Sequence, residues 1–248
     1  MSNVNDNFFD GHYKDIWKTI IPGVLTEKEV DFMLPYFNLK EGSKVLDLMC
    51  GYGRHAIALA KKGIEVTAVD NLAEYISEIK NAVEKENLAV KAIRSGVLAF
   101  STDEKFDLAI CMGNSINFFD ASDTERLLKN VSSFLKPGGR LLINSWSIAE
   151  IAIRSFKEKS ENEIGDLKFQ TEAQFLFHPA RIESESTTTD KNGKTEIKKG
   201  IDYIFSINEM ETMLSKAGFS LKEVYSIPGR KKFTIGEPRA YLVAEKNP

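Results

Sequence analysis

The central part of the chain alternates short apolar runs with amphipathic stretches. The apolar runs have the length and the branched aliphatic content of buried strands, and they lie at 44–49, 65–70, 90–94, 106–112 and 140–145. Apolar residues at helical spacing occupy the stretches 54–62, 72–86 and 122–135. Strands that alternate with helices in this way predict a parallel sheet with helices on both faces.

Capping boxes predict where several helices begin. In this pattern a Ser or Thr side chain caps the helix, and a Glu three residues later completes the box. It occurs at Thr26–Glu29, Ser122–Glu125 and Ser206–Glu209. The last of these helices is expected to end at Ala217-Gly218. Pro137-Gly138-Gly139 predicts a turn that leads into the strand at 140–145.

The pattern changes after Trp146. Apolar and polar residues alternate one by one over about 168–205, which is the spacing of half-buried strands. Asn192-Gly193 lies between two such runs and predicts a hairpin. We therefore expect a small antiparallel sheet inserted into the α/β unit. Two further strands, 221–227 and 240–245, complete the chain.

Aromatic residues are concentrated near the start of the chain, at Phe8, Phe9, Tyr13 and Trp17. Aromatics at helical spacing ordinarily pack against a core. The same residues also suit a lid that closes over a bound cofactor. The sequence leaves both interpretations open.

Composition limits the partners. The chain has 248 residues, of which 42% are hydrophobic and 28% charged, an ordinary globular mixture that can bury a substantial core. It carries 36 acidic and 33 basic residues, for a net charge of −3, whereas a phosphate-binding surface is normally basic. Nucleic acid is therefore a poor match. The dense basic run Arg230–Lys232 is interpreted as a solvated loop.

Cysteine and histidine usage argues against a disulfide framework and a dedicated zinc site. Cys50 and Cys111 lie outside metal-binding spacings, and the three histidines are scattered. The polar N-terminus has no signal-peptide core, and no run approaches the roughly 20 apolar residues that span a bilayer. These features predict a cytoplasmic protein without a membrane partner. We expect a monomer or a homodimer.

A strand that ends in a glycine turn carries the candidate binding site. Asp47 lies at the end of the strand 44–49, and Gly51-x-Gly53 then turns the chain into the helix at 54–62. Such a turn lets a ligand approach the backbone closely at the carboxyl end of a strand. The same pattern, Gly51-x-Gly53-x-x-Ala56, also satisfies the fingerprint of dinucleotide-binding proteins.

Charge separates the two kinds of ligand. A pyrophosphate needs backbone amides without a nearby anion, and two unit charges about 4 Å apart interact by about 4 kcal/mol at an effective dielectric of about 20. Asp47 therefore disfavours NAD and favours S-adenosylmethionine, which carries an ammonium and a sulfonium but no phosphate. Asp70 ends the next strand, where it can accept both ribose hydroxyls of an adenosine or cap the following helix.

Four ordered segments resemble the class I S-adenosylmethionine-dependent methyltransferase family: DLMCGYGRHAIALA at 47–60, VTAVDN at 66–71, FDLAICMGNS at 106–115 and FLKPGGRLLIN at 134–144. The resemblance covers roughly residues 40–145. It implies a doubly wound, mostly parallel sheet of seven strands whose last strand is antiparallel. It further implies that the antiparallel sheet inserted after the fifth strand helps to shape the acceptor pocket. The expected divisions are a helical cap at 1–38, a Rossmann-like domain at 39–148 and 206–248, and an inserted β subdomain at 149–205.

The resemblance implies a site with two sides. The cofactor side is expected to comprise Tyr13, Asp47, Met49, Gly51, Gly53, Arg54, Asp70, Asn71, Leu72, Gly96, Val97, Met112 and Asn114. The acceptor side is expected to comprise Trp17, Ser115, Asn117, Phe118, Asn144 and Trp146. Met49 replaces the first loop glycine of the family. Gly96 stands where an acid often binds adenine, so adenine binding is expected to rely on the Val97 backbone and on Leu72.

Methyl transfer from an already activated methyl group mainly requires that the acceptor be aligned and that water be excluded. A general base is needed only when the acceptor arrives protonated. No catalytic triad is therefore expected, and the sequence shows none. His55, in the first turn of a helix, and Cys50, in the glycine loop, are interpreted as structural residues. No catalytic residue is assigned, and no metal is expected.

Methyl transfer to a small molecule is the leading hypothesis. A nucleic-acid methyltransferase fits less well, because the Asn/Asp-Pro-Pro-Tyr motif of base methylases is absent and GNSIN at 113–117 stands in its place. A regulator that binds S-adenosylmethionine without turnover would retain the same glycine turn and acids, so the sequence leaves this alternative open. A nicotinamide oxidoreductase is disfavoured by Asp47.

Overall fold

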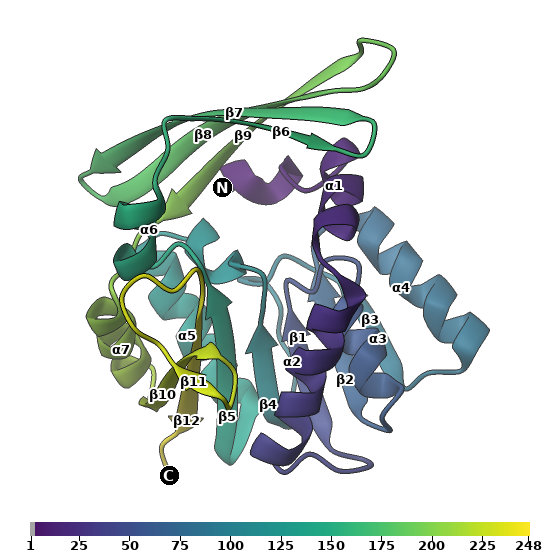
Figure 1. Cartoon of the computed structure of the whole chain (residues 1–248). Coiled ribbons are helices and arrows are strands. Elements are labelled where there is room, and N and C mark those ends of the chain that lie inside the picture. Colours follow the sequence, from purple (N-terminus) through teal and green to yellow (C-terminus); the bar gives the residue numbers. More distant parts are fainter. Residues whose placement is uncertain (1–2) are drawn as a thin grey trace.

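A computed structural model describes residues 3–248, which form a large mixed sheet and a smaller separate sheet (Figure 1). The large sheet has eight strands in the order β11-β10-β12-β5-β4-β1-β2-β3. Their bounds are β1 Lys44–Leu48, β2 Glu65–Asp70, β3 Val90–Arg94, β4 Phe106–Cys111, β5 Leu135–Ser145, β10 Phe219–Ile227, β11 Lys231–Lys232 and β12 Ala240–Lys246.

The pairing of the large sheet confirms the mixed α/β architecture. Strands β3, β2, β1, β4 and β5 pair in parallel, and the last strand, β12, runs antiparallel to both β5 and β10. The expected count of seven strands was one too low. The additional strand is β11, which has two residues and pairs antiparallel with the edge of β10. A strand of two residues is too short to show a periodic pattern. For this reason the sequence predicted a loop for the basic run that contains β11.

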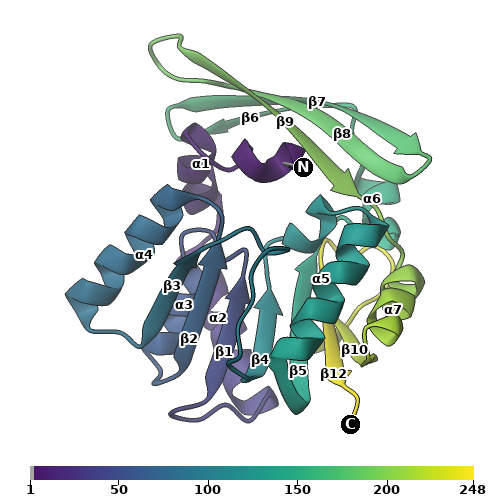
Figure 2. The same ribbon diagram turned by 180° about the vertical axis from the view of Figure 1, so that it is seen from behind.

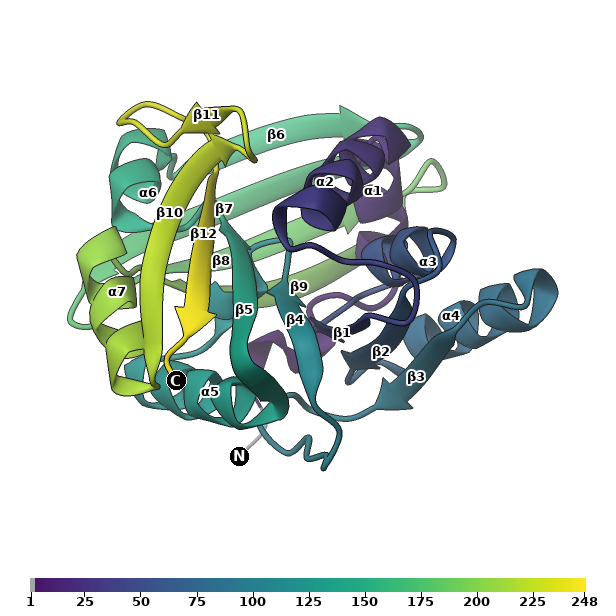
Figure 3. The same ribbon diagram turned by 90° about the horizontal axis from the view of Figure 1, so that it is seen from below.

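Helices cover both faces of the large sheet, and each face has its own apolar core. On one face lie α2 (Gly23–Tyr36), α3 (Arg54–Ala60) and α4 (Ala73–Glu86). On the other lie α5 (Ala121–Phe134) and α7 (Ile207–Lys216). Figure 3, viewed from below, shows the sheet between α2 and α3 on one side and α5 on the other. Neighbouring residues of one strand pack into the cores on opposite faces of the sheet, as Val45 and Leu46 of β1 do.

The second sheet follows β5 and the short helix α6 (Ala149–Ser155). It is antiparallel, in the order β6-β7-β8-β9, with β6 Lys159–Ile164, β7 Leu167–Phe177, β8 Ala180–Thr189 and β9 Thr195–Tyr203. The hairpin predicted at Asn192-Gly193 joins β8 to β9. There the Asp190 carboxylate accepts hydrogen bonds from the backbone amides of Asn192 and Lys194, at 2.8 and 2.9 Å.

The second sheet lies over the carboxyl edge of the large sheet (Figures 1 and 2). The N-terminal segment lies between them, as the 3-10 helix η1 (Val4–Asn7) and the helix α1 (His12–Ile20). The Asn5 side chain bonds to the backbone of Ile201 in β9. Its Nδ2 donates to the Ile201 carbonyl and its Oδ1 accepts from the Ile201 amide, both at 2.9 Å. The space above the parallel strands is thus bordered by the N-terminal segment and by the second sheet.

Two helices begin earlier than their sequences predict. In α2 the chain enters the helix at Gly23, after Pro22, so the predicted box residues Thr26 and Glu29 are internal and buried. In α5 the cap is Asp120, whose side chain accepts the Asp123 amide at 2.8 Å. The box at Ser206–Glu209 is confirmed: each side chain bonds the other residue's backbone amide at the start of α7.

The turn predicted at Pro137–Gly139 is part of β5. The register slips between Phe106↔Leu135 and Leu108↔Arg140, so these residues form a bulge within the strand. Gly138 has a φ of 70°, and a Cβ on Gly139 would lie 2.9 Å from the Lys136 carbonyl oxygen. The two glycines let the strand begin at Leu135 and still bend into register.

A buried acid joins three elements beneath the glycine turn. Glu29 of α2, 2% exposed, accepts hydrogen bonds from Arg54 Nη1 at 2.7 Å, His55 Nε2 at 2.8 Å and the Tyr241 hydroxyl at 2.7 Å. Because an ionised carboxylate only accepts, His55 Nε2 carries the shared proton. Burial raises the pKa of Glu29, but the hydrogen bond from His55 and the charge of Arg54 outweigh it and lower the pKa to about 2.

We expect Tyr241→Phe to lower the free energy of unfolding by about 1–3 kcal/mol, because one oxygen of buried Glu29 loses its donor. Urea unfolding followed by circular dichroism measures the change. Tyr203→Phe, which removes a hydroxyl from a half-exposed residue of β9, is the matched control and should change stability by less than about 0.5 kcal/mol. Equal losses in the two variants would contradict a special role for the Glu29 cluster.

Candidate active site

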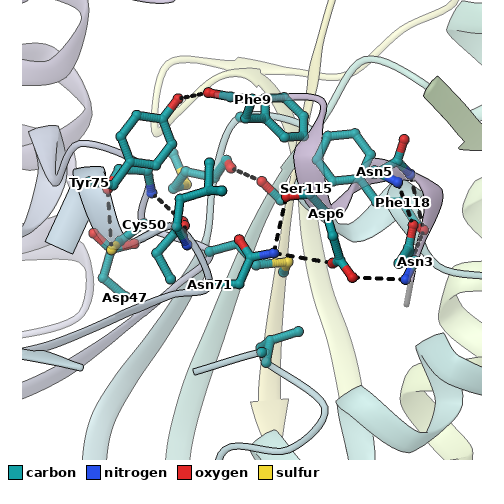
Figure 4. A pocket seen from close by; sticks show the side chains of 18 of the residues that line it. Asn3, Asn5, Asp6, Phe9, Asp47, Cys50, Asn71, Tyr75, Ser115 and Phe118 are labelled. Carbon is teal, nitrogen blue, oxygen red and sulfur yellow. Dashed lines mark hydrogen bonds between the residues drawn. The ribbon is translucent and has the colours of Figure 1, made fainter. Parts of the chain in front are cut away.

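The candidate site lies at the carboxyl edge of the parallel strands, where open α/β sheets bind ligands. A cavity of about 760 Å³ occupies this edge. It is lined by the glycine loop after β1, by the segments after β2, β3 and β4, and by η1 and α1 of the N-terminal segment. Figure 4 shows residues of the N-terminal segment facing those of the loops.

The glycine loop has a left-handed backbone that glycine, which lacks a Cβ, adopts without strain. Gly51 and Gly53 have φ values of 56° and 80°. A Cβ on Gly53 would lie 2.6 Å from Ile79 Cγ1, so a larger residue would push the loop away from α4. Met49 also has a positive φ, 53°, at the position where the family places glycine. Its left-handed conformation costs about 1–2 kcal/mol, and its side chain lines the cavity.

Asp47 presents an unsatisfied carboxylate beneath this loop. The residue is 1% exposed, and within residues 3–248 its Oδ2 has no hydrogen-bond donor. Burial and, to a smaller extent, the nearby Asp70 charge raise its pKa to about 7, against the charge of Arg54 and a hydrogen bond from the Ala56 amide. A buried acid left without a partner is costly, and a cationic ligand group at the cavity wall would supply that partner.

Asp70 joins the glycine loop to the start of α4 through its two carboxylate oxygens. Its Oδ1 accepts the Leu72 amide at 3.0 Å at the start of α4, and its Oδ2 accepts the Gly51 amide at 2.9 Å. Since a carboxylate offers about four acceptor positions, two remain for hydroxyl groups in the cavity. Burial raises the pKa of Asp70, and these amide bonds oppose the shift.

The structure brings most of the predicted site residues together around the large cavity. These are Trp17, Asp47, Met49, Gly51, Arg54, Asp70, Asn71, Leu72, Gly96, Val97, Met112, Ser115, Phe118 and Trp146. Gly53 lies behind the loop, against Ile79, and does not line the cavity. Tyr13 and Asn114 line a second, adjoining cavity. Asn117 and Asn144 line neither.

Asn114 is the centre of a buried hydrogen-bond network. Its Oδ1 accepts the amides of Trp146 and Ser147, both at 2.9 Å. Its Nδ2 donates to Ser147 Oγ at 2.8 Å and to Asp202 Oδ1 at 3.0 Å. The residue therefore ties the loop after β4 to the end of β5 and to β9.

Asn117 and Asn144 make similar buried connections. Asn117 Nδ2 donates to the carbonyls of Ser147 and Tyr203, at 3.2 and 2.8 Å. Asn144 Nδ2 donates to the Ala240 carbonyl at 3.2 Å. Both side chains were predicted to face the acceptor. Instead, Asn117 bonds to the end of β9, and Asn144 bonds to the start of the last strand, β12.

Sequence reasoning missed the contribution of η1. Asn3 Nδ2 donates to the Phe118 carbonyl at 2.8 Å, and the Asp6 carboxylate accepts from Asn71 Nδ2 at 3.1 Å (Figure 4). Asn3, Asn5 and Asp6 all line the large cavity. A few polar residues in an N-terminal tail carry no periodic signal, so nothing in the sequence distinguishes them from a solvated terminus.

Other unpredicted lining residues are neighbours of the recognised motifs: Phe9, Ile21, Cys50, Tyr52, His55, Tyr75, Ser95, Leu98, Ala99, Gly113, Phe119, Asp123 and Arg126. The His55 imidazole is held by Glu29, and burial and then the charge of Arg54 lower its pKa. Burial raises the pKa of the Cys50 thiol, so it is not poised as a thiolate nucleophile. Both observations agree with structural roles.

The second cavity, of about 200 Å³, lies between the N-terminal segment and the second sheet. It shares part of its lining with the large cavity: Asn5, Phe9, Trp17, Gly113, Phe118 and Trp146. The second sheet contributes alternate residues of β7 and β8 and three consecutive residues of β9: Phe169 and Thr171, Ser184 and Ser186, and Gly200, Ile201 and Asp202. The site is therefore a large chamber with a small, roofed extension.

Comparison with known proteins agrees with this geometry. Residues 45–139, from β1 to the bulge of β5, match the profile of a methyltransferase domain. The segment from β1 to β5 is thus a methyltransferase domain. A putative methyltransferase of Bacillus subtilis, YqeM, is 28% identical to this methyltransferase over 213 residues, which are 82% of each chain.

Two further relatives define the extent of the likeness. A ubiquinone biosynthesis O-methyltransferase of Coxiella burnetii is 33% identical over 106 residues, 42% of this chain and 44% of that protein. An S-adenosylmethionine-dependent methyltransferase of Clostridium acetobutylicum has the same fold, with a TM-score of 0.81 at 20% identity over 95% of this chain and 96% of that one. The large sheet, with its separate antiparallel sheet, is thus an established methyltransferase fold.

The residues of the large cavity fit the cofactor of this family, S-adenosylmethionine. The unpartnered Asp47 carboxylate matches a ligand ammonium, and the free acceptor positions of Asp70 match ribose hydroxyls. The glycine loop gives the ligand close access to backbone. Within residues 3–248, no cluster of three or more His, Cys, Asp or Glu side chains could hold a metal ion. No helix in the same range is long and apolar enough to cross a membrane.

We expect Asp47→Asn to stabilise the ligand-free methyltransferase at pH 8 and to change it little near pH 4. The pKa of about 7 in the folded protein lies above the ordinary value of 3.8 for an aspartate, so the wild type loses stability as the pH rises through this window. The gain is at most about 4 kcal/mol, since one pKa unit corresponds to about 1.4 kcal/mol. Urea unfolding of both proteins at the two pH values measures it.

Other titrating groups are common to both proteins, so they cancel in this comparison. A stability difference that is the same at both pH values would show that Asp47 is not the titrating group. Calorimetry on the same variant should show weaker binding of S-adenosylhomocysteine, because the acid that faces the ligand ammonium is neutral.

Proposed function

We propose that this methyltransferase transfers a methyl group from S-adenosylmethionine to a small-molecule acceptor bound in the second cavity. The observation that carries the proposal is the 200 Å³ extension of the cofactor chamber. It is roofed by β7, β8 and β9 and bounded by α1, so it suits a small molecule better than a nucleic-acid strand. The name of the Coxiella burnetii relative, which refers to ubiquinone biosynthesis, agrees with a small acceptor.

The cofactor would be held by acids at its two polar ends. We assign its ammonium to Asp47 and its ribose hydroxyls to Asp70, with the glycine loop between them. The adenine would lie along Leu72, Gly96 and Val97, where no side chain fills the position next to Gly96 within 4 Å. When bound, S-adenosylmethionine supplies a methyl group that is already activated by the positive charge on sulfur.

The protein's own contribution is alignment and the exclusion of water. The acceptor cavity joins the cofactor chamber beside Gly113, Trp17 and Trp146, so an acceptor there approaches from the side opposite the adenine. Holding two reactants in line can lower a barrier by roughly 7–11 kcal/mol. The aromatic side chains of α1 and Phe169 of the second sheet border this cavity and would limit the access of water to a bound acceptor.

Turnover of labelled S-adenosylmethionine with a fractionated metabolite extract tests the proposal. Transfer of label to a small molecule is the expected result. Label that enters only added RNA or DNA would support a nucleic-acid methyltransferase. Binding of S-adenosylhomocysteine by calorimetry, with no turnover in any fraction, would support a silent regulator. NAD binding in place of S-adenosylhomocysteine would overturn the assignment of Asp47.

We expect Asp70→Ala to weaken S-adenosylhomocysteine binding by about tenfold to a hundredfold, since hydrogen bonds to a charged group contribute about 1.5–3 kcal/mol. The variant also loses the bond to the Gly51 amide, so the glycine loop loosens. Calorimetry measures the affinity. Asp31→Ala, on the exposed side of α2, is the control and should bind as the wild type does. Unchanged affinity in a folded Asp70 variant would leave this acid with a purely structural role.

We also expect residues 8–20 to exchange amide hydrogens more slowly when S-adenosylhomocysteine is added. This segment lines both cavities and is tied to α4 by the hydrogen bond from the Tyr75 hydroxyl to the Phe9 carbonyl, at 2.8 Å. Mass spectrometry of peptic fragments measures the change. The exposed hairpin tip at 190–194 serves as the internal reference. Exchange that ignores the ligand would make the N-terminal aromatics ordinary packing rather than a lid.

A further inference from the structure

The wall of the second cavity is largely aromatic. It includes Phe8, Phe9, Tyr13, Trp17, Phe118, Trp146 and Phe169. Their rings are in contact around the space: centroids lie 5.7 Å apart for Trp17 and Trp146, and 6.1 Å apart for Tyr13 and Phe169. The faces of aromatic rings carry partial negative charge and attract cations.

Among residues 3–248, Asp202 is the one charged side chain in the lining of this cavity. Its Oδ1 accepts from Asn114 Nδ2 at 3.0 Å, and within residues 3–248 neither a hydrogen-bond donor to Oδ2 nor an ion-pair partner is present. Tyr13 lies near enough for the Asp202 charge to raise its pKa, together with burial, so the phenol stays protonated. An ionised Asp202 would therefore face the cavity without a balancing cation.

The remaining polar groups of the lining are neutral, and several are already paired. Thr171 Oγ1 and Ser186 Oγ lie 3.1 Å apart, and Ser184 Oγ donates to the Gly200 carbonyl at 3.5 Å. The electrostatic character of the cavity is thus set by one carboxylate and a ring of aromatic faces. Both favour a positive group, and both disfavour an anion.

We propose that the methyl acceptor is a small amine that enters as an ammonium ion and is held between the aromatic ring wall and the Asp202 carboxylate. This inference rests on the proposed function, because it names the acceptor of that same reaction. An alcohol would leave the carboxylate without a counter-ion, and a carboxylic acid would be repelled by it. Asn114 orients Asp202, and its own position is fixed by the backbone of Trp146 and Ser147.

The proton balance of the reaction agrees with this assignment. An ammonium nitrogen has no free electron pair, so it must lose one proton before the new N–C bond forms and the C–S bond breaks. Asp202 lies in the acceptor cavity and takes that proton as a carboxylate. Burial raises the pKa of Asp202 to about 7, against the hydrogen bond from Asn114. This higher pKa makes the carboxylate a stronger base, closer in basicity to an amine. The products are the methylated amine, S-adenosylhomocysteine and one proton on Asp202.

Tryptophan fluorescence provides a direct test, because Trp17 and Trp146 are the only two tryptophans in the chain and both line the cavity. The full-length protein, saturated with S-adenosylhomocysteine, would be titrated with benzylamine, benzyl alcohol and benzoate as probes of one shape. We expect benzylamine to bind at least about tenfold more tightly than the alcohol, and benzoate to bind most weakly. Equal binding of amine and alcohol, or tighter binding of benzoate, would overturn the inference.

The variant Asp202→Asn removes the charge and keeps an oxygen for Asn114. It should lose the preference for the amine and leave the affinities for benzyl alcohol and S-adenosylhomocysteine within about twofold of wild type. Asp166→Asn, at an exposed turn of the same sheet, is the matched control and should retain the preference. A preference that persists in Asp202→Asn would make Asp202 only a support for Asn114. If this variant does not fold, the comparison of the three probes on the wild type still tests whether the cavity prefers an amine.

The two proposals fail in different ways. Loss of the proposed function would appear as absent binding of S-adenosylhomocysteine in calorimetry or absent turnover in the metabolite screen. Loss of the amine inference alone would appear as normal S-adenosylhomocysteine binding without amine selectivity in the fluorescence titration. Turnover that labels an alcohol or an acid, and no amine, would also refute the inference and leave the methyltransferase assignment in place.

Discussion

The Glu29 carboxylate is the contact on which the rest of the site depends. It receives donors from Arg54, His55 and Tyr241, and so joins α2, the first turn of α3 and the last strand β12. The glycine loop is the segment between β1 and α3, so its exit is fixed by this acid. Removing one member of such a group leaves the others buried and unpaired, which costs more than the hydrogen bond itself contributes.

Three acids illustrate how environment divides roles within one fold. Glu29 is surrounded by donors, and its pKa is low. Asp47 and Asp202 each keep an oxygen without a donor within residues 3–248, each faces a cavity, and burial raises the pKa of both to about 7. The first acid stabilises the scaffold, whereas the other two cost free energy that a cationic ligand group would offset. That contrast separates a structural acid from the two acids to which we assign binding roles.

The parallel strands and the glycine turn were readable in the sequence because their signals are local. Apolar runs, Gly51-x-Gly53 and Asp70 need no knowledge of distant residues. The roles of Asn114 and Asn5 could not be read in this way, since their partners Asp202 and Ile201 lie 88 and 196 residues further along the chain. Thr26 resembled a helix cap because its spacing to Glu29 fits the pattern, yet an earlier start at Gly23 places both inside α2.

The alternation of side chains in the second sheet has a consequence for how such an enzyme diversifies. On β7 and β8 only every second residue lines the second cavity, among them Phe169 and Ser184, whereas on β9 the consecutive residues 200–202 line it. The parallel core lies in a different sheet. Substitutions at these positions can therefore reshape the acceptor cavity while the cofactor chamber keeps its structure. The roof is an exchangeable specificity module, and redesign of the enzyme for a new acceptor would begin there.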